Sequence, residues 1–127
     1  MPLNVSENEY RVLLVDDDRC VLLILGRILQ GIGCYVSVVE KGCDALQHLE
    51  SQNFDAVIID VRLQDMNGID LLNLIHKKTP TMTKIVFRGY PSDEDRLRAL
   101  EQGANYYLAK PIPSEKLIQI IENNMRA

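Results

Sequence analysis

Several charged residues of this sequence stand at the ends of short apolar runs. Asp16 and Asp17 follow VLLV, Asp60 ends AVIID, and Lys110 follows NYYLA. If the first and third strands along the chain are neighbours in the sheet, the carboxylates of Asp16, Asp17 and Asp60 converge within several ångströms and oppose one another's ionisation. A hard divalent cation such as Mg²⁺ would relieve that repulsion, because it binds through one or two carboxylates and leaves positions for phosphate oxygens.

The same residues suit phosphoryl transfer. A carboxylate flanked by a metal ion and a lysine can act as a nucleophile toward phosphorus and form an aspartyl phosphate, and Asp60 is the candidate. Lys110 supplies a flexible positive charge for the phosphoryl oxygens. Asp16 and Asp17 are better suited to holding the metal, because they form an adjacent pair. The protein would then contribute mainly positioning and charge neutralisation.

Each of these residues also has an ordinary structural explanation. Asp16 and its two acidic neighbours could cap the helix that follows them. Asp60 could be a solvated turn acid, and Lys110 could be an exposed surface lysine. Taken singly, these explanations are about as good as the chemical one. Their joint occurrence at one edge of a predicted sheet favours a shared site.

The elements that would position these residues alternate along the chain. The runs VLLV, AVII and KIVF are apolar at successive positions, which is typical of parallel strands covered on both faces. Amphipathic segments separate them. We therefore predict an α/β fold with one doubly wound, five-stranded parallel sheet and five helices on its two faces. In such sheets ligands bind outside the carboxyl ends of the strands. The predicted strands are 11–15, 34–39, 56–60, 84–88 and 105–109.

The first helical segment carries an apolar stripe and two further leucines. Leu22 and Leu23 lie off the stripe, so we predict that they are exposed and belong to a docking surface. The alternative is that they cover the edge of the sheet. The stripe itself, at helical spacing and predicted to face the core, comprises Val21, Ile24, Leu25, Ile28 and Leu29.

Other polar side chains are predicted to be solvated. Ser92 is expected to be the N-cap of a helix whose first turn is acidic. His48 and His76 are expected on helix surfaces. The charged face of the helix after Ser92, also expected to be exposed, comprises Asp93, Glu94, Asp95, Arg96 and Arg98.

Length and composition indicate one globular domain. The 127 residues include 14 basic and 18 acidic side chains, for a net charge of −4. This balance disfavours direct nucleic-acid binding, which needs clustered Lys and Arg. The polar N-terminus lacks the features of a secretory signal, and no apolar run is long enough for a membrane span. We therefore expect a cytoplasmic protein whose three cysteines are reduced.

Three motifs stand in order along the chain: VLLVDDD at 12–18, DAVIIDVRLQDMNGIDLL at 55–72 and DRLRALEQGANYYLAKPI at 95–112. Together they resemble the receiver domains of two-component response regulators. The resemblance extends over residues 10–127, with 1–9 as a short polar extension. It implies a flavodoxin-like fold with strand order 2-1-3-4-5. It also implies a signalling module rather than an enzyme.

The resemblance assigns roles to individual residues. Asp60 looks like the phosphoacceptor and Lys110 like the lysine that contacts the phosphoryl group. Asp17, Asp60 and the backbone carbonyl of Arg62 look like ligands of Mg²⁺, with Asp16 acting through water. Three further positions match a loop glycine, a switch aromatic residue and a proline that is usually cis, namely Gly68, Tyr107 and Pro111.

The implied partners follow from the same resemblance. They are a sensor histidine kinase or a histidine phosphotransfer protein, and a downstream output domain or protein. A homodimer is compatible with this interpretation. Direct nucleic-acid and membrane contacts are not expected.

Arg88 departs from the family pattern, which places Thr or Ser at the end of the fourth strand to bond a phosphoryl oxygen. Arg88, followed by the retained small residue Gly89, could bind the phosphoryl group through a bidentate contact. It could instead point into solvent and uncouple phosphorylation from Tyr107. Both alternatives stay open. Gln64 replaces a frequent proline and would loosen the loop after Asp60.

The leading hypothesis is a receiver domain that takes a phosphoryl group from a phosphohistidine onto Asp60 with Mg²⁺ and later loses it to water. The alternative, motivated by Arg88, is a degenerate receiver that acts as a phosphorylation-independent interaction module. A phosphohydrolase is disfavoured, because we expect no cap domain in a chain of this length. A flavin-binding domain is disfavoured by the acidic loop after that strand.

Overall fold

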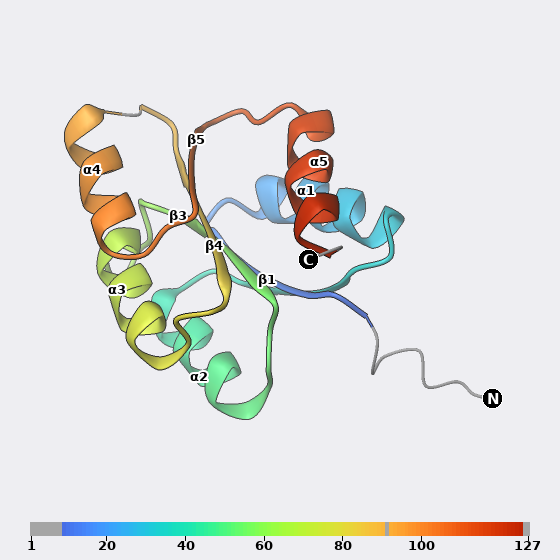
Figure 1. Ribbon diagram of the computed structural model, residues 1–127, viewed down its shortest axis with the longest axis horizontal. Coiled ribbons are helices and arrows are strands. Elements are labelled where there is room, and N and C mark those ends of the chain that lie inside the picture. The colour runs from blue at the N-terminus through green and yellow to red at the C-terminus, as the bar shows by residue number, and fades with distance from the viewer. Residues whose placement is uncertain (1–8, 91, 126–127) are drawn as a thin grey trace.

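The chain folds as a three-layer α/β sandwich. The structure is a computed structural model and describes residues 9–90 and 92–125. Its middle layer is a five-stranded parallel sheet in the order β2-β1-β3-β4-β5. In Figure 1, α1 and α5 cover one face, and α2, α3 and α4 cover the other. The predicted fold class and strand order are confirmed, whereas nearly all of the predicted extension 1–9 lies outside the described residues.

Strands and helices alternate as predicted. Two of the strands have the predicted bounds, and the other three differ at one end by a single residue, which is ordinary variation at element ends. The strands are β1 (Arg11–Val15), β2 (Tyr35–Val39), β3 (Ala56–Asp60), β4 (Thr83–Arg88) and β5 (Tyr106–Ala109). The helices are α1 (Arg19–Gly31), α2 (Gly42–Ser51), α3 (Gly68–Lys78), α4 (Asp93–Glu101) and α5 (Ser114–Met125).

The central strands are buried on both faces, as their continuous apolar runs predict. Successive side chains of a strand point to opposite faces of the sheet, so Val12 and Leu14 pack in one apolar cluster with Leu117 of α5. Leu13 and Val15 pack in the other cluster, with the helices of the opposite layer. The sheet is therefore enclosed between two apolar cores, one on each face.

The buried face of α1 differs from the prediction. Leu22, predicted to be exposed, is only 6% exposed and belongs to the core. Ile24, predicted to face the core, is 58% exposed, so both predictions were wrong. Leu23, at 56%, is exposed as predicted. Apolar residues line two adjacent stripes of this helix, one residue apart, and both have core-like spacing. The way α1 rests on the sheet selects the second stripe, which comprises Leu22, Leu25, Gly26 and Leu29.

The ends of several helices are fixed by polar caps. Asp18 accepts hydrogen bonds from the backbone nitrogens of Cys20 and Val21 at the start of α1. Ser92 Oγ accepts from the backbone nitrogen of Asp95, 3.1 Å away, so the predicted cap of α4 is confirmed. Such caps satisfy amide groups that the helix itself cannot pair.

His76, at the end of α3, is not a solvated surface residue as predicted. Its ring is half-buried against Gly103, and a Cβ atom added at Gly103 would lie 2.5 Å from the ring. The Nδ1 atom of His76 is buried without a hydrogen-bond partner among the residues described. Gly103 also has a φ of +110°, which favours glycine.

The three cysteines, Cys20, Cys34 and Cys43, are free thiols, and only Cys34 is buried. None of the helices described between residues 9 and 125 combines the length and apolar character needed to cross a bilayer.

Candidate functional site at the carboxyl edge of the sheet

The carboxyl ends of three parallel strands bring the predicted site residues to one edge. Asp16 follows β1, Asp60 ends β3, and Lys110 follows β5. β1 and β3 are neighbours in the sheet. One carboxylate oxygen from each of Asp16, Asp17 and Asp60 lies within 4.8 Å of the others. Segments far apart in the sequence thus form one acidic cluster, defined here as these three residues.

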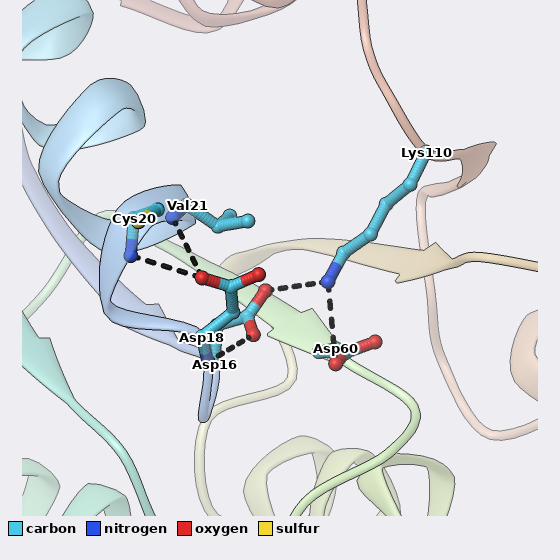
Figure 2. A network of polar contacts seen from close by, with 6 residues as sticks. All are labelled: Asp16, Asp18, Cys20, Val21, Asp60 and Lys110. Atoms are coloured by element: carbon cyan, nitrogen blue, oxygen red, sulfur yellow. Dashed lines mark hydrogen bonds and ion pairs between the residues drawn. The ribbon is translucent and has the colours of Figure 1, made fainter.

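Lys110 extends between Asp16 and Asp60 of this cluster, as Figure 2 shows. Its Nζ lies 2.7 Å from Asp16 Oδ2 and 3.3 Å from Asp60 Oδ2. Asp16 and Asp60 are buried, whereas Asp17 is exposed. The Lys110–Pro111 peptide bond is cis, as the resemblance predicts.

Burial raises the pKa of Asp60, and the nearby charge of Asp16 raises it further, while Lys110 acts in the opposite direction. Burial also disfavours the charged form of Lys110, but its contacts with Asp16 and Asp60 outweigh burial and raise its pKa. One lysine therefore leaves the acidic cluster with excess negative charge. A cluster of hard oxygen donors with that charge fits a divalent cation such as Mg²⁺.

The third acid of the DDD run has a different role. Asp18 caps α1, and its own backbone nitrogen donates to Asp16 Oδ1 at 2.9 Å. The structural explanation considered for the whole run therefore applies to Asp18. The backbone nitrogen of Asp18 holds Oδ1 of Asp16, while Oδ2 of the same carboxylate contacts Lys110 (Figure 2).

The loop from Asp60 to α3 folds tightly beside the acidic cluster. The Gly68 backbone nitrogen donates to the Val61 carbonyl at 2.7 Å. A Cβ atom at residue 68 would collide with the backbone oxygen of Asp60, so this close approach requires glycine. Arg62 is exposed on this loop and forms an isolated bridge with Asn67. Asp17 and the loop line an open depression next to the cluster.

Asp65 is a residue of this loop that the sequence interpretation missed. Its carboxylate accepts hydrogen bonds from the backbone nitrogens of Gly42 at 2.8 Å and Cys43 at 2.9 Å, at the start of α2. These contacts lower the pKa of Asp65. The residues are more than twenty positions apart along the chain, so no local pattern could have indicated the contact. Asp65 fastens the loop to α2.

Arg88 ends β4 and turns toward α4. Its Nε lies 3.0 Å from Asp95 Oδ2 and donates to the Tyr90 carbonyl oxygen at 2.9 Å. The prediction that Asp95 is part of an exposed helix face was wrong, because this contact half-buries it. Gly89 is exposed beside Arg88.

Tyr107, on β5, packs its ring against the core between the sheet and the layer of α2, α3 and α4. Its hydroxyl is buried, and within the described part of the chain it has no hydrogen-bond partner. An unpaired buried hydroxyl is costly, because it has lost its contacts with water. Packing of the ring therefore stabilises the inward orientation of Tyr107, and the unpaired hydroxyl destabilises it.

This fold and this edge define the class of protein. The family model of the response regulator receiver domain matches residues 12–122, so the chain belongs to the receiver domains of two-component response regulators. Proteins of this family are signalling modules, and they typically bind Mg²⁺ at an acidic pocket.

Several known proteins are similar to it. The chain is 36% identical over 118 residues to the transcriptional regulatory protein ZraR of Escherichia coli (strain K12), covering 93% of this chain but only 27% of ZraR. A CheY-like receiver domain from Methanospirillum hungatei JF-1 superposes with a TM-score of 0.89 at 33% identity, covering 93% and 94% of the two chains. The beryllofluoride-activated NtrC4 receiver domain dimer gives 0.87 at 26% identity, covering 92% and 97%.

Proposed function

We propose that this receiver domain accepts a phosphoryl group from a phosphohistidine onto Asp60. The observation that carries the proposal is the Lys110 ammonium, which contacts both Asp16 and Asp60 beside the exposed Asp17. In the transfer, an Asp60 oxygen forms a bond to phosphorus, the bond from phosphorus to the imidazole nitrogen breaks, and the imidazole leaves as the neutral base after taking up a proton. Water later releases inorganic phosphate and restores the Asp60 carboxylate.

Asp16, Asp17, Asp60 and the backbone carbonyl of Arg62 would hold Mg²⁺, with Asp16 acting through water. The ion would offset the repulsion between the carboxylate and the incoming phosphoryl oxygens. Lys110 would hold a phosphoryl oxygen by direct ion pairing, since it already reaches the Asp60 carboxylate. The domain promotes its own phosphorylation and dephosphorylation and does not turn over a separate substrate.

The experiment is labelling with acetyl phosphate, a small phosphodonor. Wild type should be labelled only with Mg²⁺ present, and Asp60→Asn should not be labelled. Asp70→Asn is the matched control, because it removes an exposed carboxylate at the start of α3 and should leave labelling unchanged. Absence of label in wild type would favour the second candidate, a degenerate receiver that works through protein contacts alone. That candidate is motivated by the contact of Arg88 with Asp95.

Arg88 in place of the usual Thr or Ser would modify the output of the switch. Its guanidinium ties the end of β4 to the first turn of α4. A hydroxyl at this position would lack that connection. The coupling between the site and Tyr107 would therefore differ from that of a receiver with Thr or Ser.

The exposed face of α1 would contact a histidine kinase or a histidine phosphotransfer protein. Leu23 and Ile24 are adjacent, apolar and more than half exposed, and Arg19 and Arg27 flank them. Leu23→Glu combined with Ile24→Glu should slow transfer from a phosphorylated kinase that labels wild type, without changing labelling by acetyl phosphate. Leu97→Glu, an exposed leucine on α4, is the control. Equal slowing with both donors would rule this docking surface out.

The remaining parts of the proposal concern the whole protein. ZraR is much longer than this chain, so an output domain or protein downstream of residues 10–127 is part of the proposal. A cytoplasmic location follows from the kinase partner. A homodimer is suggested by the dimer of the NtrC4 receiver domain, and sedimentation with and without beryllofluoride would test it.

A further inference from the structure

Arg88 and Asp95 form an ion pair that is less exposed to solvent than the other ion pairs found outside the acidic cluster among the described residues. Their side chains are 25% and 18% exposed, whereas the side chains of the pair Arg19–Glu40 are 85% and 42% exposed. Partial burial reduces screening by water and salt, so this pair contributes more than an ordinary surface pair. Arg88 is thus held by a specific partner on α4.

The backbone of Arg88 nevertheless lies next to the acidic cluster. Asp60 is paired with Phe87, the preceding residue of β4. The Lys110 backbone nitrogen donates to the Arg88 carbonyl at 3.0 Å. Neighbouring strands are about 4.8 Å apart, so the Arg88 backbone lies one strand away from Asp60, and its guanidinium is carried on a long, flexible side chain.

The contacts that Arg88 makes in this structure leave part of its guanidinium available for another anionic partner. Its contacts with Asp95 and with the Tyr90 carbonyl both use Nε. A guanidinium binds phosphate oxygens most strongly through two parallel N–H bonds. A phosphoryl group on Asp60 would offer more negative charge and more acceptor oxygens than one carboxylate does.

From this geometry we propose that Asp95 competes with the phosphoryl group for Arg88, which deepens the proposed function and rests on it. Asp95 is a positioning residue: it holds Arg88 on α4 while Asp60 is unmodified. Phosphorylation draws Arg88 to the edge of the sheet. The first turn of α4 and the Tyr90 carbonyl then lose their tie to the Arg88 side chain at the end of β4.

The competition predicts that removing Asp95 strengthens anion binding at Asp60. The probe is beryllofluoride with Mg²⁺, measured by isothermal titration calorimetry. Asp95→Asn should bind it about fivefold more tightly, or about 1 kcal/mol, as expected for loss of a partly screened competing ion pair. Asp93→Asn makes the same charge change in the same turn at an exposed position and should bind like wild type.

A double-variant cycle tests whether the effect passes through Arg88. In the Arg88→Ala background, Asp95→Asn should change the affinity for beryllofluoride by less than twofold. An equal gain with and without Arg88, or equal gains in Asp93→Asn and Asp95→Asn, would overturn the competition. If Asp95→Asn does not fold, as judged by circular dichroism, Asp95→Ser takes its place.

A second readout follows the release of α4. In wild type, beryllofluoride should increase amide hydrogen exchange in the first turn of α4, and in Asp95→Asn the exchange should already be raised without it. Unchanged exchange in wild type with the ligand bound would overturn the release. Failure of wild type to bind beryllofluoride or to accept label from acetyl phosphate would instead refute the proposed function.

Discussion

Replacing Asp60 by asparagine should stabilise the metal-free protein, although it removes an ion pair. At an effective dielectric constant of about 20, two carboxylates at the 4.8 Å upper limit of the acidic cluster repel each other by about 3.5 kcal/mol, and Lys110 attracts Asp60, 3.3 Å away, by about 5 kcal/mol. The repulsion between Asp60 and the buried Asp16 alone therefore offsets most of the attraction between Asp60 and Lys110, and the exposed Asp17 adds to that repulsion. The cost of burying the Asp60 carboxylate then makes the charged residue destabilising overall, so Asp60→Asn should raise the free energy of unfolding, in agreement with the raised pKa of Asp60.

The expected gain of Asp60→Asn at pH 7 without metal is about 1–2 kcal/mol, the usual size of a single-residue effect of this kind. It depends on pH. Because the pKa of Asp60 is raised on folding, its contribution to stability is greatest below the ordinary value of 3.8 and is lost as the pH rises through the folded pKa. The advantage of Asp60→Asn should therefore shrink on acidification.

Urea unfolding followed by circular dichroism, with EDTA and with saturating Mg²⁺, measures both effects. Wild type should gain about 2.7 kcal/mol at a Mg²⁺ concentration one hundred times its dissociation constant, and Asp60→Asn should gain much less. Asp70→Asn, which removes an exposed acid, should resemble wild type throughout. An Asp60→Asn protein no more stable than wild type in EDTA, or a wild type indifferent to Mg²⁺, would refute the electrostatic reasoning.

Three further substitutions test other parts of the structure. Gly68→Ala should lower the free energy of unfolding by about 2–3 kcal/mol, because its Cβ collides with the Asp60 backbone oxygen; an alanine variant as stable as wild type in urea would mean that the loop can move aside. Tyr107→Phe should raise stability by about 1 kcal/mol, because it removes a hydroxyl that is buried and unpaired among the described residues; a lower melting temperature would show that the hydroxyl is satisfied. Burial raises the pKa of Cys34 from 9.0 to about 11, so the stability that its thiol contributes is full below pH 9 and is lost as the pH rises toward 11. Wild type should then lose up to about 3 kcal/mol relative to Cys34→Ala over that range, whereas parallel pH curves from urea unfolding would contradict the assignment.

Local patterns of this sequence were sufficient for the elements and for part of the site. Apolar runs covered on both faces predicted the three central strands, and Ser92 followed by acids predicted the start of α4. The convergence of Asp16, Asp17 and Asp60 was expected because parallel strands end at a common edge. Each of these conclusions depends on residues that are neighbours in the sequence or on a general rule of parallel sheets.

Other features depend on contacts between distant segments. The two apolar stripes of α1 have the same spacing, so only the docking of the helix on the sheet decided that Leu22 is buried and Ile24 exposed. Asp65 reaches α2 across the fold, and no periodicity records such a contact. The two alternatives for Arg88 were the phosphoryl group and solvent, whereas the structure gives it a third partner, Asp95.

By itself, the sequence determined which residues end the strands, and hence that acids and a lysine would meet at one edge of an α/β sheet. The parallel direction and the burial of the central strands follow from short-range patterns, because parallel strands covered by helices on both faces are apolar at successive positions. The tertiary structure alone decided which helix face is buried, which carboxylate caps a helix rather than joining the acidic cluster, and where Arg88 points. Those choices depend on the relative placement of elements, and small differences in packing and charge between distant side chains determine them.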